Sequence, residues 1–309
     1  MKSPGGQMKK SLKYKYRNEL EVLPFLLPGF ILLLIFIFYP IVKNFYMSLS
    51  DYNIFLDKMN VFVGFSNYIK AFKDKMFWDS FVNTAMYAVV TILPQMAIGL
   101  ILAIIINTKI KGSFMFRILY YIPVITSWLI VSLIFRYLFE SGDAGLINYL
   151  LLKSGLVPKS ISWFSNRWTA NAVIWILAVW KGIGWNMVVF LAGLQGIDKS
   201  YYEAADIDGA NIIQKVRFIT IPLLKPVTFF IMTNLLVGSF NVFTQVYVMT
   251  NGAPMGRTQV LLSYMYKVAF TDFQIGYSSA LSVVVGVFIF ILAMGQQKIL
   301  HMGYKEGQI

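Results

Sequence analysis

The sequence predicts an all-α, polytopic membrane protein with about six transmembrane helices, and three observations carry this expectation. Hydrophobic residues make up 58% of the 309 positions and charged residues only 13%, which is too little charge for a soluble domain of this size. The apolar residues are gathered in long runs without charge, the pattern of segments that cross hydrocarbon. The net charge is +13, yet the basic residues lie between those runs, where they orient a membrane protein and do not form a nucleic-acid surface.

Six uncharged intervals are the expected spans. Each is long enough to cross about 30 Å of hydrocarbon at about 1.5 Å per residue, with tilt to take up the excess. A single charge interrupts the fourth interval, and prolines in or beside the others are tolerated as kinks. The spans are residues 22–42, 80–108, 118–135, 168–197, 226–252 and 273–297. They form one transmembrane domain, 22–298, between a basic N-terminal segment, 1–21, and a short tail, 299–309.

Basic residues cluster before the first span and after the second and sixth spans. Cytoplasmic loops are enriched in Lys and Arg, so these clusters predict that both termini lie in the cytoplasm, as an even number of spans requires. No small-residue cleavage signal follows the first apolar run, so we expect that run to be retained as a helix. The basic residues concerned are Lys2, Lys9, Lys10, Lys13, Lys15, Arg17, Lys109, Lys111, Arg117, Lys298 and Lys305.

A polar stretch, 201–226, separates the fourth and fifth spans and is predicted to form a cytoplasmic helical hairpin. Ser200 followed by Glu203 is typical of a capping box that starts a helix. Gly209 permits a turn, and Asn211 begins a second short helix. That helix is expected to end, and the fifth span to begin, at Pro222 and Pro226. The alternative is a solvated loop with helical character.

Residues of this hairpin recur at fixed spacings. They are Glu203, Ala204, Ala205, Gly209, Ile219 and Pro222. This series resembles the EAA signature of the membrane subunits of binding-protein-dependent ABC importers. Further motifs resemble the carbohydrate-uptake branch of that family, the maltose-type permeases: DGA (208–210), IPLLKP (221–226), VYVMTNGAPMGRT (246–258) and GYSSALS (276–282). The resemblance covers nearly all of the chain from about residue 20 onward.

The resemblance implies that the hairpin is a coupling helix that docks into a cleft on a separate ATPase. The coupling residues it implies are Glu203, Ala204, Ala205, Asp208 and Gly209. It also implies a homologous second permease subunit, two ATPase subunits that hold ATP and Mg, and an extracytoplasmic solute-binding protein. The expected location is the bacterial cytoplasmic (inner) membrane, and the expected cargo is a sugar or oligosaccharide.

The composition agrees with ATP hydrolysis on a separate subunit. There is no cysteine, and the single histidine, His301, cannot build a histidine-rich metal site. No G-x-x-x-x-G-K-[ST] loop is present to cradle ATP, and no pair of carboxylates suggests acid–base catalysis. We therefore expect a transport subunit, not an enzyme, with no catalytic, metal or cofactor site of its own.

The fifth span carries polar residues that would share one helical face. Asn234, Gly238, Asn241 and Gln245 are spaced i, i+4, i+7 and i+11. Amides are costly in hydrocarbon unless they are paired or face a cavity, so the stripe favours a water-filled path, and amides suit neutral hydroxyl groups. The alternative is packing between helices, which Asn and Gly also mediate in membranes.

The fourth span contains WKGIGWN (180–186), which places a lysine and two glycines near mid-membrane. A glycine-interrupted span points to a binding site, and the faces of Trp180 and Trp185 could stack on a sugar ring. By the resemblance, the sugar-contacting positions of a maltose-type permease fall on Ala178, Lys181, Gly182, Trp185, Asn234, Val237, Gly238 and Asn241. Ala178, Lys181, Val237 and Gly238 depart from the residues expected there, so the ligand is not expected to be maltose.

A lysine near the bilayer centre costs about 2.5–3.5 kcal/mol on insertion scales, so Lys181 is expected to have a function. We hypothesise that it meets an anionic substrate such as a uronate-containing oligosaccharide. The alternatives are that it snorkels outward or pairs with an acid of the second permease. Two other functions stay open: an ABC permease for another small solute such as a glycerol phosphate ester, and an ion-coupled secondary transporter. The latter would need a mid-membrane acid or sodium site, and no acid lies within the six intervals.

Overall fold

The computed structural model describes residues 24–52, 61–108, 112–142 and 145–306, with the side chains of 297 and 299–306 left aside. The described chain is helical, as predicted. Its strands are β1 (Ser50–Asp51) and β2 (Val61–Phe62), a two-residue antiparallel pair in which Ser50 lies opposite Phe62. The expected basic segment 1–21, together with Lys109 and Lys111, lies outside the described residues.

Within the described residues, four helices are long and apolar enough to cross a membrane unbroken. They are the first helix, Pro24–Ser48, then α4 (Lys75–Asn107), α8 (Arg167–Gln195) and the Ile275–Gln296 part of α15 (Ile275–Glu306). The first helix includes the π-helical turn η1 (Leu34–Phe38) and α2 (Tyr39–Ser48). Two bent helix pairs bring the total to six if each pair is one span. The predicted intervals thus lie close to the observed helices, because the thickness of hydrocarbon sets the length of each apolar run.

The third span is not the single helix expected over 118–135. It consists of α5 (Ser113–Ile125) and α6 (Trp128–Leu138), which meet at an angle of 95°. Thr126 and Ser127 adopt extended backbone angles between them, so the last carbonyl groups of α5 have no partner in a following helical turn.

The fifth span also departs from the predicted interval 226–252. Helix α12 (Lys225–Phe240) ends early, and α13 (Thr244–Met249) follows after a short break. At its other end, α12 meets the helical segment Ile212–Leu223 at 66°. The break after α12 lies at residues 241–243, where Asn241 and Phe243 leave the helical backbone angles.

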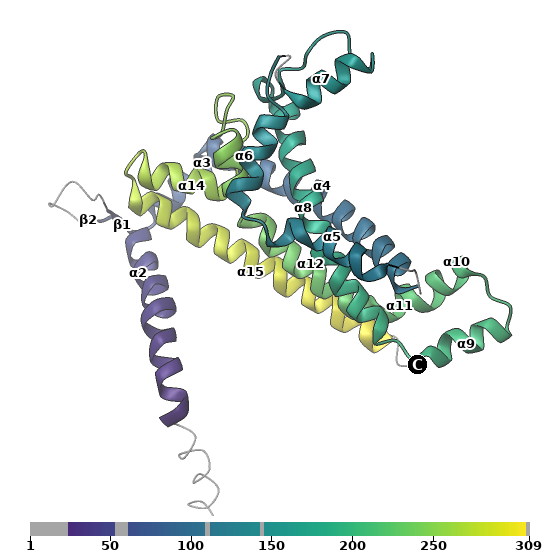
Figure 1. Cartoon of the computed structure of the whole chain (residues 1–309). Helices are drawn as coiled ribbons and strands as arrows, with labels where there is room; N and C mark the ends of the chain where they lie inside the picture. The colour runs from purple at the N-terminus through teal and green to yellow at the C-terminus, as the bar shows by residue number, and fades with distance from the viewer. Residues whose placement is uncertain (1–23, 53–60, 109–111, 143–144, 307–309) are drawn as a thin grey trace, which may run out of the picture.

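Helices α4 and α8 pack side by side through the centre of the bundle, with α5 and α12 against them (Figure 1). Their close approach depends on Gly99, where an added Cβ would lie 2.7 Å from the Cβ of Asn186. Helix α15 crosses the bundle and contacts α2, α12 and α14 (Leu261–Phe270). The first helix is different, because none of its most apolar stretch is buried, and Figure 1 shows it standing away from the bundle.

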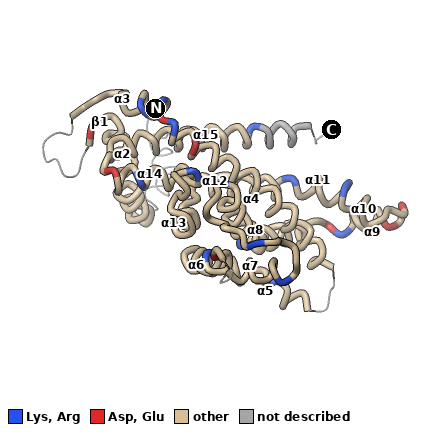
Figure 2. Tube along the Cα trace, turned by 90° about the horizontal axis from the view of Figure 1, so that it is seen from above, with Lys and Arg blue, Asp and Glu red and all other residues tan. Residues whose placement is uncertain are grey.

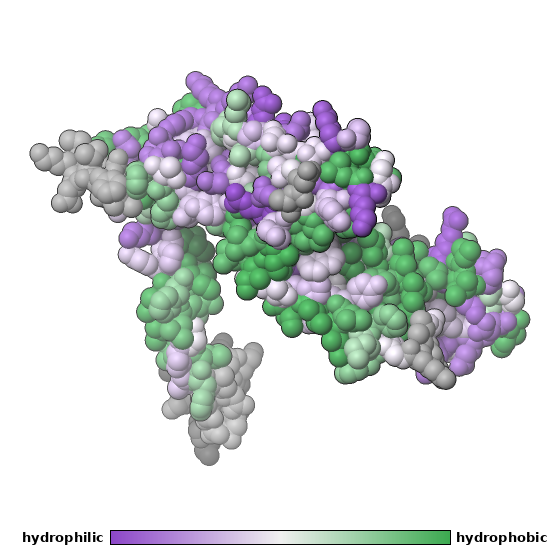
Figure 3. Space-filling model, turned by 45° about the horizontal axis from the view of Figure 1, so that its top comes forward, coloured by the Kyte–Doolittle hydropathy of each residue, from purple (hydrophilic) through white to green (hydrophobic). Residues whose placement is uncertain are grey.

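Charged residues gather at the two ends of the molecule. Figure 2 shows the helices of the bundle almost free of charge, and Figure 3 shows apolar side chains as a band between polar ends. One end carries α9 (Lys199–Ile207) and α10 (Ile212–Lys215); the other carries α3 (Ser66–Lys73), α7 (Leu146–Lys153) and α14. We call these the hairpin end and the opposite end. The free end of the first helix and the C-terminal end of α15 both lie toward the hairpin end, as an even number of spans requires (Figure 1).

At the opposite end, Asp74 joins three helices at the start of α4. Its carboxylate accepts hydrogen bonds from the hydroxyl of Tyr264 on α14 and, at 2.6 Å, from the hydroxyl of Tyr277 on α15. Its other oxygen caps α4 by accepting from the backbone N–H of Met76 at 2.8 Å. This junction fixes α14 and α15 relative to the second span.

The hairpin forms as predicted, with two corrections. Helix α9 is capped by Asp198, which accepts from the backbone N–H of Ser200 at 2.9 Å, so the predicted Ser200–Glu203 capping box is wrong. Hydrogen bonds from the backbone and the side chain of Ser200 also lower the pKa of the Asp198 carboxyl below its ordinary value. The capping box lies instead at the start of α10, between Asn211 and Gln214.

The second arm of the hairpin is longer than expected. Helix α10 continues through the π-helical turn η3 (Val216–Thr220) into α11 (Ile221–Leu223). Pro222 therefore does not end the helix. It lies in the first turn of α11, and Pro226 lies in the first turn of α12, where a missing N–H costs little.

Candidate functional site

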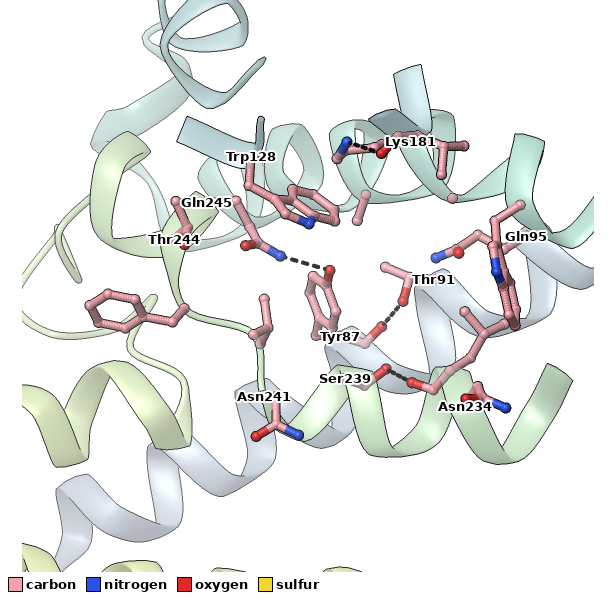
Figure 4. Close-up of a pocket in the computed structure, with 18 residues that line it drawn as sticks. Tyr87, Thr91, Gln95, Trp128, Lys181, Asn234, Ser239, Asn241, Thr244 and Gln245 are labelled. Carbon is pink, nitrogen blue, oxygen red and sulfur yellow. Dashed lines mark hydrogen bonds between the residues drawn. The ribbon is translucent and has the colours of Figure 1, made fainter. Parts of the chain in front are cut away.

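One cavity of about 360 Å³ lies in the middle of the bundle, between α4, the α5–α6 break, α8, α12 and α13. All six residues predicted to form the substrate path contribute to its lining: Lys181, Gly182, Trp185, Asn234, Gly238 and Asn241. Ala178 lines it as well, whereas Val237 does not. We call this space the central cavity (Figure 4).

The ammonium group of Lys181 is buried within the protein and bound by backbone carbonyl groups. Its Nζ donates to the carbonyl oxygens of Pro123 at 2.5 Å, Thr126 at 2.6 Å and Val124 at 3.1 Å. It also lies 4.9 Å from the centre of the Trp128 ring, a cation–π distance. The side chain does not snorkel outward, since Lys181 is only 4% exposed.

These contacts explain how the third span can break inside a membrane. The three carbonyl groups end α5, where no helical N–H reaches them, and unsatisfied carbonyls are costly away from water. An ammonium group has three donors, and here the three carbonyls use them all. Positive charge is also favourable at the C-terminal end of a helix. Lys181 therefore stabilises the corner that forms one wall of the central cavity.

The glycines beside Lys181 allow close packing in an unbroken helix. An added Cβ at Gly184 would lie 1.9 Å from the carbonyl oxygen of Tyr120 on α5, and one at Gly182 would lie 1.9 Å from Oε1 of Gln95 on α4. The predicted interruption of the fourth span is absent, because α8 continues through both positions. Gly184 brings the helix to the backbone of α5, close to the carbonyls that Lys181 binds.

The polar stripe does not follow one helix. Asn234 and Gly238 lie on α12, Asn241 ends it, and Gln245 lies on α13, so the expected single face over three turns is wrong beyond Asn241. All four residues still line the central cavity. Asn234, Gly238 and Asn241 are exposed on its rim, whereas Gln245 is buried and donates to the hydroxyl of Tyr87 at 3.0 Å.

The two asparagine side chains on the rim donate hydrogen bonds through their Nδ2 atoms. Nδ2 of Asn234 donates to the carbonyl of Phe230 at 2.8 Å, and Nδ2 of Asn241 donates to that of Val237 at 2.9 Å. These bonds tie the side chains to their own helix and leave the Oδ1 atoms available as acceptors for a hydroxyl group.

Sequence reasoning missed the contribution of α4. Tyr87, Thr91 and Gln95 line the cavity from this helix, and Thr91 donates to the carbonyl of Tyr87 at 2.7 Å (Figure 4). Their four-residue spacing, inside an otherwise apolar run, places them on one helical face and was a usable signal. Trp180, by contrast, lies outside the cavity and contacts Phe135 at 5.6 Å between ring centres.

The cavity suits a neutral or anionic polar ligand. Among the described lining residues Lys181 is the only charged one, and the others supply amides, hydroxyls and aromatic rings without a carboxylate. Amides and hydroxyls both donate and accept, which matches a compound with many hydroxyl groups.

The predicted coupling residues lie far from this cavity, at the hairpin end. Glu203, Ala204 and Ala205 are on α9, and Asp208 and Gly209 form the turn that follows. All are exposed except the half-buried Ala205. The two arms are joined by Tyr202 and Thr220, whose hydroxyl oxygens lie 2.9 Å apart, and by an ion pair between Lys215 and Asp206.

Relatives of known name are similar over nearly the whole chain. The probable ABC transporter permease protein YurN of Bacillus subtilis is 33% identical over 94% of this chain and 99% of its own length. The arabinooligosaccharides transport system permease protein AraP of Halalkalibacterium halodurans is 32% identical over 93% and 90%. The lactose transport system permease protein LacF of Rhizobium radiobacter is 32% identical over 88% and 91%.

A solved structure has the same fold. It belongs to a bacterial ABC transporter involved in the import of the acidic polysaccharide alginate, and it is 21% identical with a TM-score of 0.81 over 94% of this chain and 98% of that one. The family model of the binding-protein-dependent transport system inner membrane component matches residues 95–303. Together with the relatives that span nearly its full length, this match shows that the chain belongs to the family of binding-protein-dependent transport system inner membrane components.

Proposed function

We propose that the chain is the permease subunit of an ATP-driven importer and forms part of the translocation path for a sugar or oligosaccharide. The observation that carries this proposal is the central cavity, which offers amides, hydroxyls and the ring of Trp185 in the middle of the membrane-spanning bundle. Such a lining binds a polyhydroxylated solute better than an apolar one. The relatives named for arabinooligosaccharides and lactose support the same class of cargo.

An acidic sugar is the cargo that the charge of the cavity favours. Lys181 brings a positive charge to the wall, and no carboxylate among the described lining residues neutralises it. Because its three donors are used by carbonyls, the attraction would act through space and not through a direct hydrogen bond. The similarity in fold to an importer of alginate, an acidic polysaccharide, supports this choice.

ATP hydrolysis belongs, in this proposal, to two separate ATPase subunits that hold ATP and Mg. Glu203, Ala204, Ala205, Asp208 and Gly209 form the coupling segment on which an ATPase docks. The hairpin presents Ile207 (87% exposed), Ile212 (67%) and Ile213 (73%) at a polar end of the molecule, where a cytoplasmic partner would cover them. The hairpin end and both termini then face the cytoplasm of a bacterial cell.

A homologous second permease would complete the path. The rim residues Asn234, Gly238 and Asn241 are exposed on the open side of the cavity, and none of the most hydrophobic stretch of the first helix is buried. A second subunit would cover both. An extracytoplasmic solute-binding protein would deliver the sugar at the opposite end.

Reconstitution of the complex in proteoliposomes tests the proposal. We expect uptake of labelled oligosaccharides that requires the binding protein outside and ATP inside, with uronate oligomers preferred over neutral ones of equal length. Equal transport of the two would remove the acidic preference. Uptake of glycerol phosphate esters instead of sugars, or uptake that needs an ion gradient and no ATP, would contradict the proposed function.

A further inference from the structure

A second polar pocket, of about 300 Å³, lies at the opposite end of the molecule, between the end of α13, the turn that follows it and α14. We call it the outer pocket. Its polar and aromatic lining includes Tyr247, Asn251, Gln259, Tyr266, Lys267 and Thr271.

We propose that the outer pocket is a second carbohydrate subsite, which holds one terminal unit of an oligosaccharide at the entrance to the central cavity. The inference rests on the proposed function, since it assumes that the cargo is an oligosaccharide. It adds a site outside the bundle centre and predicts a dependence on chain length.

The outer pocket is built on a firmly held turn. The hydroxyl of Thr258 lies 2.9 Å from that of Thr250 and 2.8 Å from the carbonyl oxygen of Ala253. Nδ2 of Asn83, on α4, donates to the carbonyls of Arg257 at 2.9 Å and Gln259 at 2.7 Å. A pocket held in place in this way loses little entropy when it binds a ligand.

Tight packing against a glycine fixes the buried amide of the outer pocket. Gly252 has a φ of +83°, and an added Cβ there would lie 2.3 Å from Nε2 of Gln259. Gln259 is only 6% exposed, and its Oε1 accepts from the hydroxyl of Ser263. Among the described residues no acceptor binds its Nε2, so this donor is available to a ligand in the pocket.

The chemistry of the outer pocket repeats that of the central cavity. Each is lined by one lysine, by amides and hydroxyls and by aromatic rings, and neither has a carboxylate among its described lining residues. Lys267 would attract an acidic unit, while Asn251 and Gln259 would bind hydroxyl groups. The two sites therefore select the same class of ligand.

A continuous aromatic wall joins the two sites. Tyr247 and Tyr266 line the outer pocket and lie 5.4 Å apart between ring centres. Phe243, which lines the central cavity, stacks on Tyr247 at 5.1 Å and contacts Tyr266 at 5.0 Å. These rings offer a sugar chain faces on which to stack between the outer pocket and the central cavity.

Uptake kinetics with oligomers of two to five units test the subsite in the reconstituted complex. In Tyr247→Ala and Lys267→Met we expect the KM of the tetrasaccharide to rise about tenfold, while the KM of the disaccharide changes less than about twofold. The matched controls are Tyr149→Ala and Lys153→Met, exposed residues of α7 at the same end, which should change neither value.

A photoreactive uronate tetrasaccharide supplies a readout that does not depend on transport. We expect it to label residues between Tyr247 and Thr271 in the wild-type complex, with less label in Lys267→Met. No label there, or an equal rise of KM at every chain length with weaker docking of the binding protein, would overturn the subsite. If the wild type imports no oligosaccharide of any length, the proposed function fails first, and the subsite falls with it unless the label is found.

Discussion

Nζ of Lys181 lies 2.6 Å from the carbonyl oxygen of Thr126, at the corner where the third span turns by 95°. The two residues are 55 positions apart, so the corner depends on a contact between spans. A charge that would be costly in hydrocarbon is stabilised by carbonyl groups that would themselves be costly if left free. The ammonium group and the carbonyl groups thus satisfy each other's hydrogen bonds.

Replacing Lys181 with Met should therefore destabilise the corner. Three carbonyls would lose their donor, and a buried unsatisfied polar group costs about 1–3 kcal/mol. We expect a loss of at least about 3 kcal/mol in the free energy of unfolding, together with faster proteolysis near Thr126 in the purified complex. Lys181→Arg, which keeps the charge and the donors, should retain more stability.

The competing hypothesis predicts a different pattern for the same variant. If Lys181 contacted the substrate directly, Lys181→Met would unfold at the wild-type temperature and lose only the transport of acidic sugars. Melting temperature measured beside the uptake of neutral and uronate oligomers separates the two roles.

The glycines of α8 should differ in what their replacement disturbs. At Gly184 an added Cβ meets the backbone carbonyl of Tyr120, which cannot move without shifting α5. At Gly182 it meets the tip of the Gln95 side chain, which can rotate. We expect Gly184→Ala to lower the melting temperature by several degrees, and Gly182→Ala to leave it nearly unchanged but alter the KM for the sugar. Equal melting temperatures would show that α5 and α8 can separate at little cost.

Most of the spans could be predicted because hydrocarbon thickness and the absence of charge act locally in the sequence. The breaks could not be predicted in the same way. Pro123 signals a kink, but a 95° corner also requires the ammonium of Lys181 on another span. The early end of α12 at Phe240 likewise leaves Gln245 on another helix, although both helices border one cavity.

Among the cavity residues too, those with a local signal in the sequence could be predicted and those that depend on a contact between spans could not. Asn234 and Asn241 were predictable because an amide in an apolar run is conspicuous. The role of Lys181 was not predictable, because the sequence indicates its depth in the membrane but not the carbonyl groups that it contacts on another span. Thr91 and Gln95 lay within reach of the same helical-spacing rule that identified the stripe on the fifth span.

Asp74 should make stability depend on pH at the opposite end. Burial raises the pKa of its carboxyl, but the hydrogen bonds that it accepts lower the pKa by more, so the pKa lies below its ordinary value. The donors are the hydroxyls of Tyr264 and Tyr277 and the backbone N–H groups of Met76 and Phe77. A lowered pKa in the folded state stabilises the protein above the unfolded pKa of about 3.9, and this stabilisation is lost as pH falls through the folded value.

The variant Asp74→Asn removes that dependence. At pH 7 we expect it to be less stable than the wild type by about 1–2 kcal/mol, because a neutral amide is a weaker acceptor. Between about pH 5 and pH 3 the wild type should lose stability faster, so that the two melting temperatures converge. Parallel curves over that range would show that Asp74 does not change its ionisation on unfolding.

Asn241 tests whether the rim of the cavity belongs to the transport path. Asn241→Leu removes an exposed acceptor, and the hydrogen bond that its Nδ2 donates goes to Val237 on its own helix. We expect uptake to be abolished, while assembly of the complex and basal ATP hydrolysis stay largely unchanged. Dissociation of the complex in detergent would instead assign Asn241 to packing against the second permease.

Gly209 tests the coupling hairpin. Its φ is +72°, in the left-handed region, and an added Cβ would meet nothing within 4 Å, so the cost of a side chain there comes from the backbone alone. A left-handed conformation costs a non-glycine residue about 1–2 kcal/mol, and more for a β-branched one. Gly209→Val should therefore change the turn between α9 and α10 without affecting the spans.

We expect normal insertion and complex assembly, but loss of sugar-stimulated ATP hydrolysis. Gly209→Asn is the control, because asparagine tolerates the left-handed region and should keep most of the stimulation. Full stimulation in Gly209→Val would show that the geometry of this turn does not transmit the signal between the cavity and the ATPase.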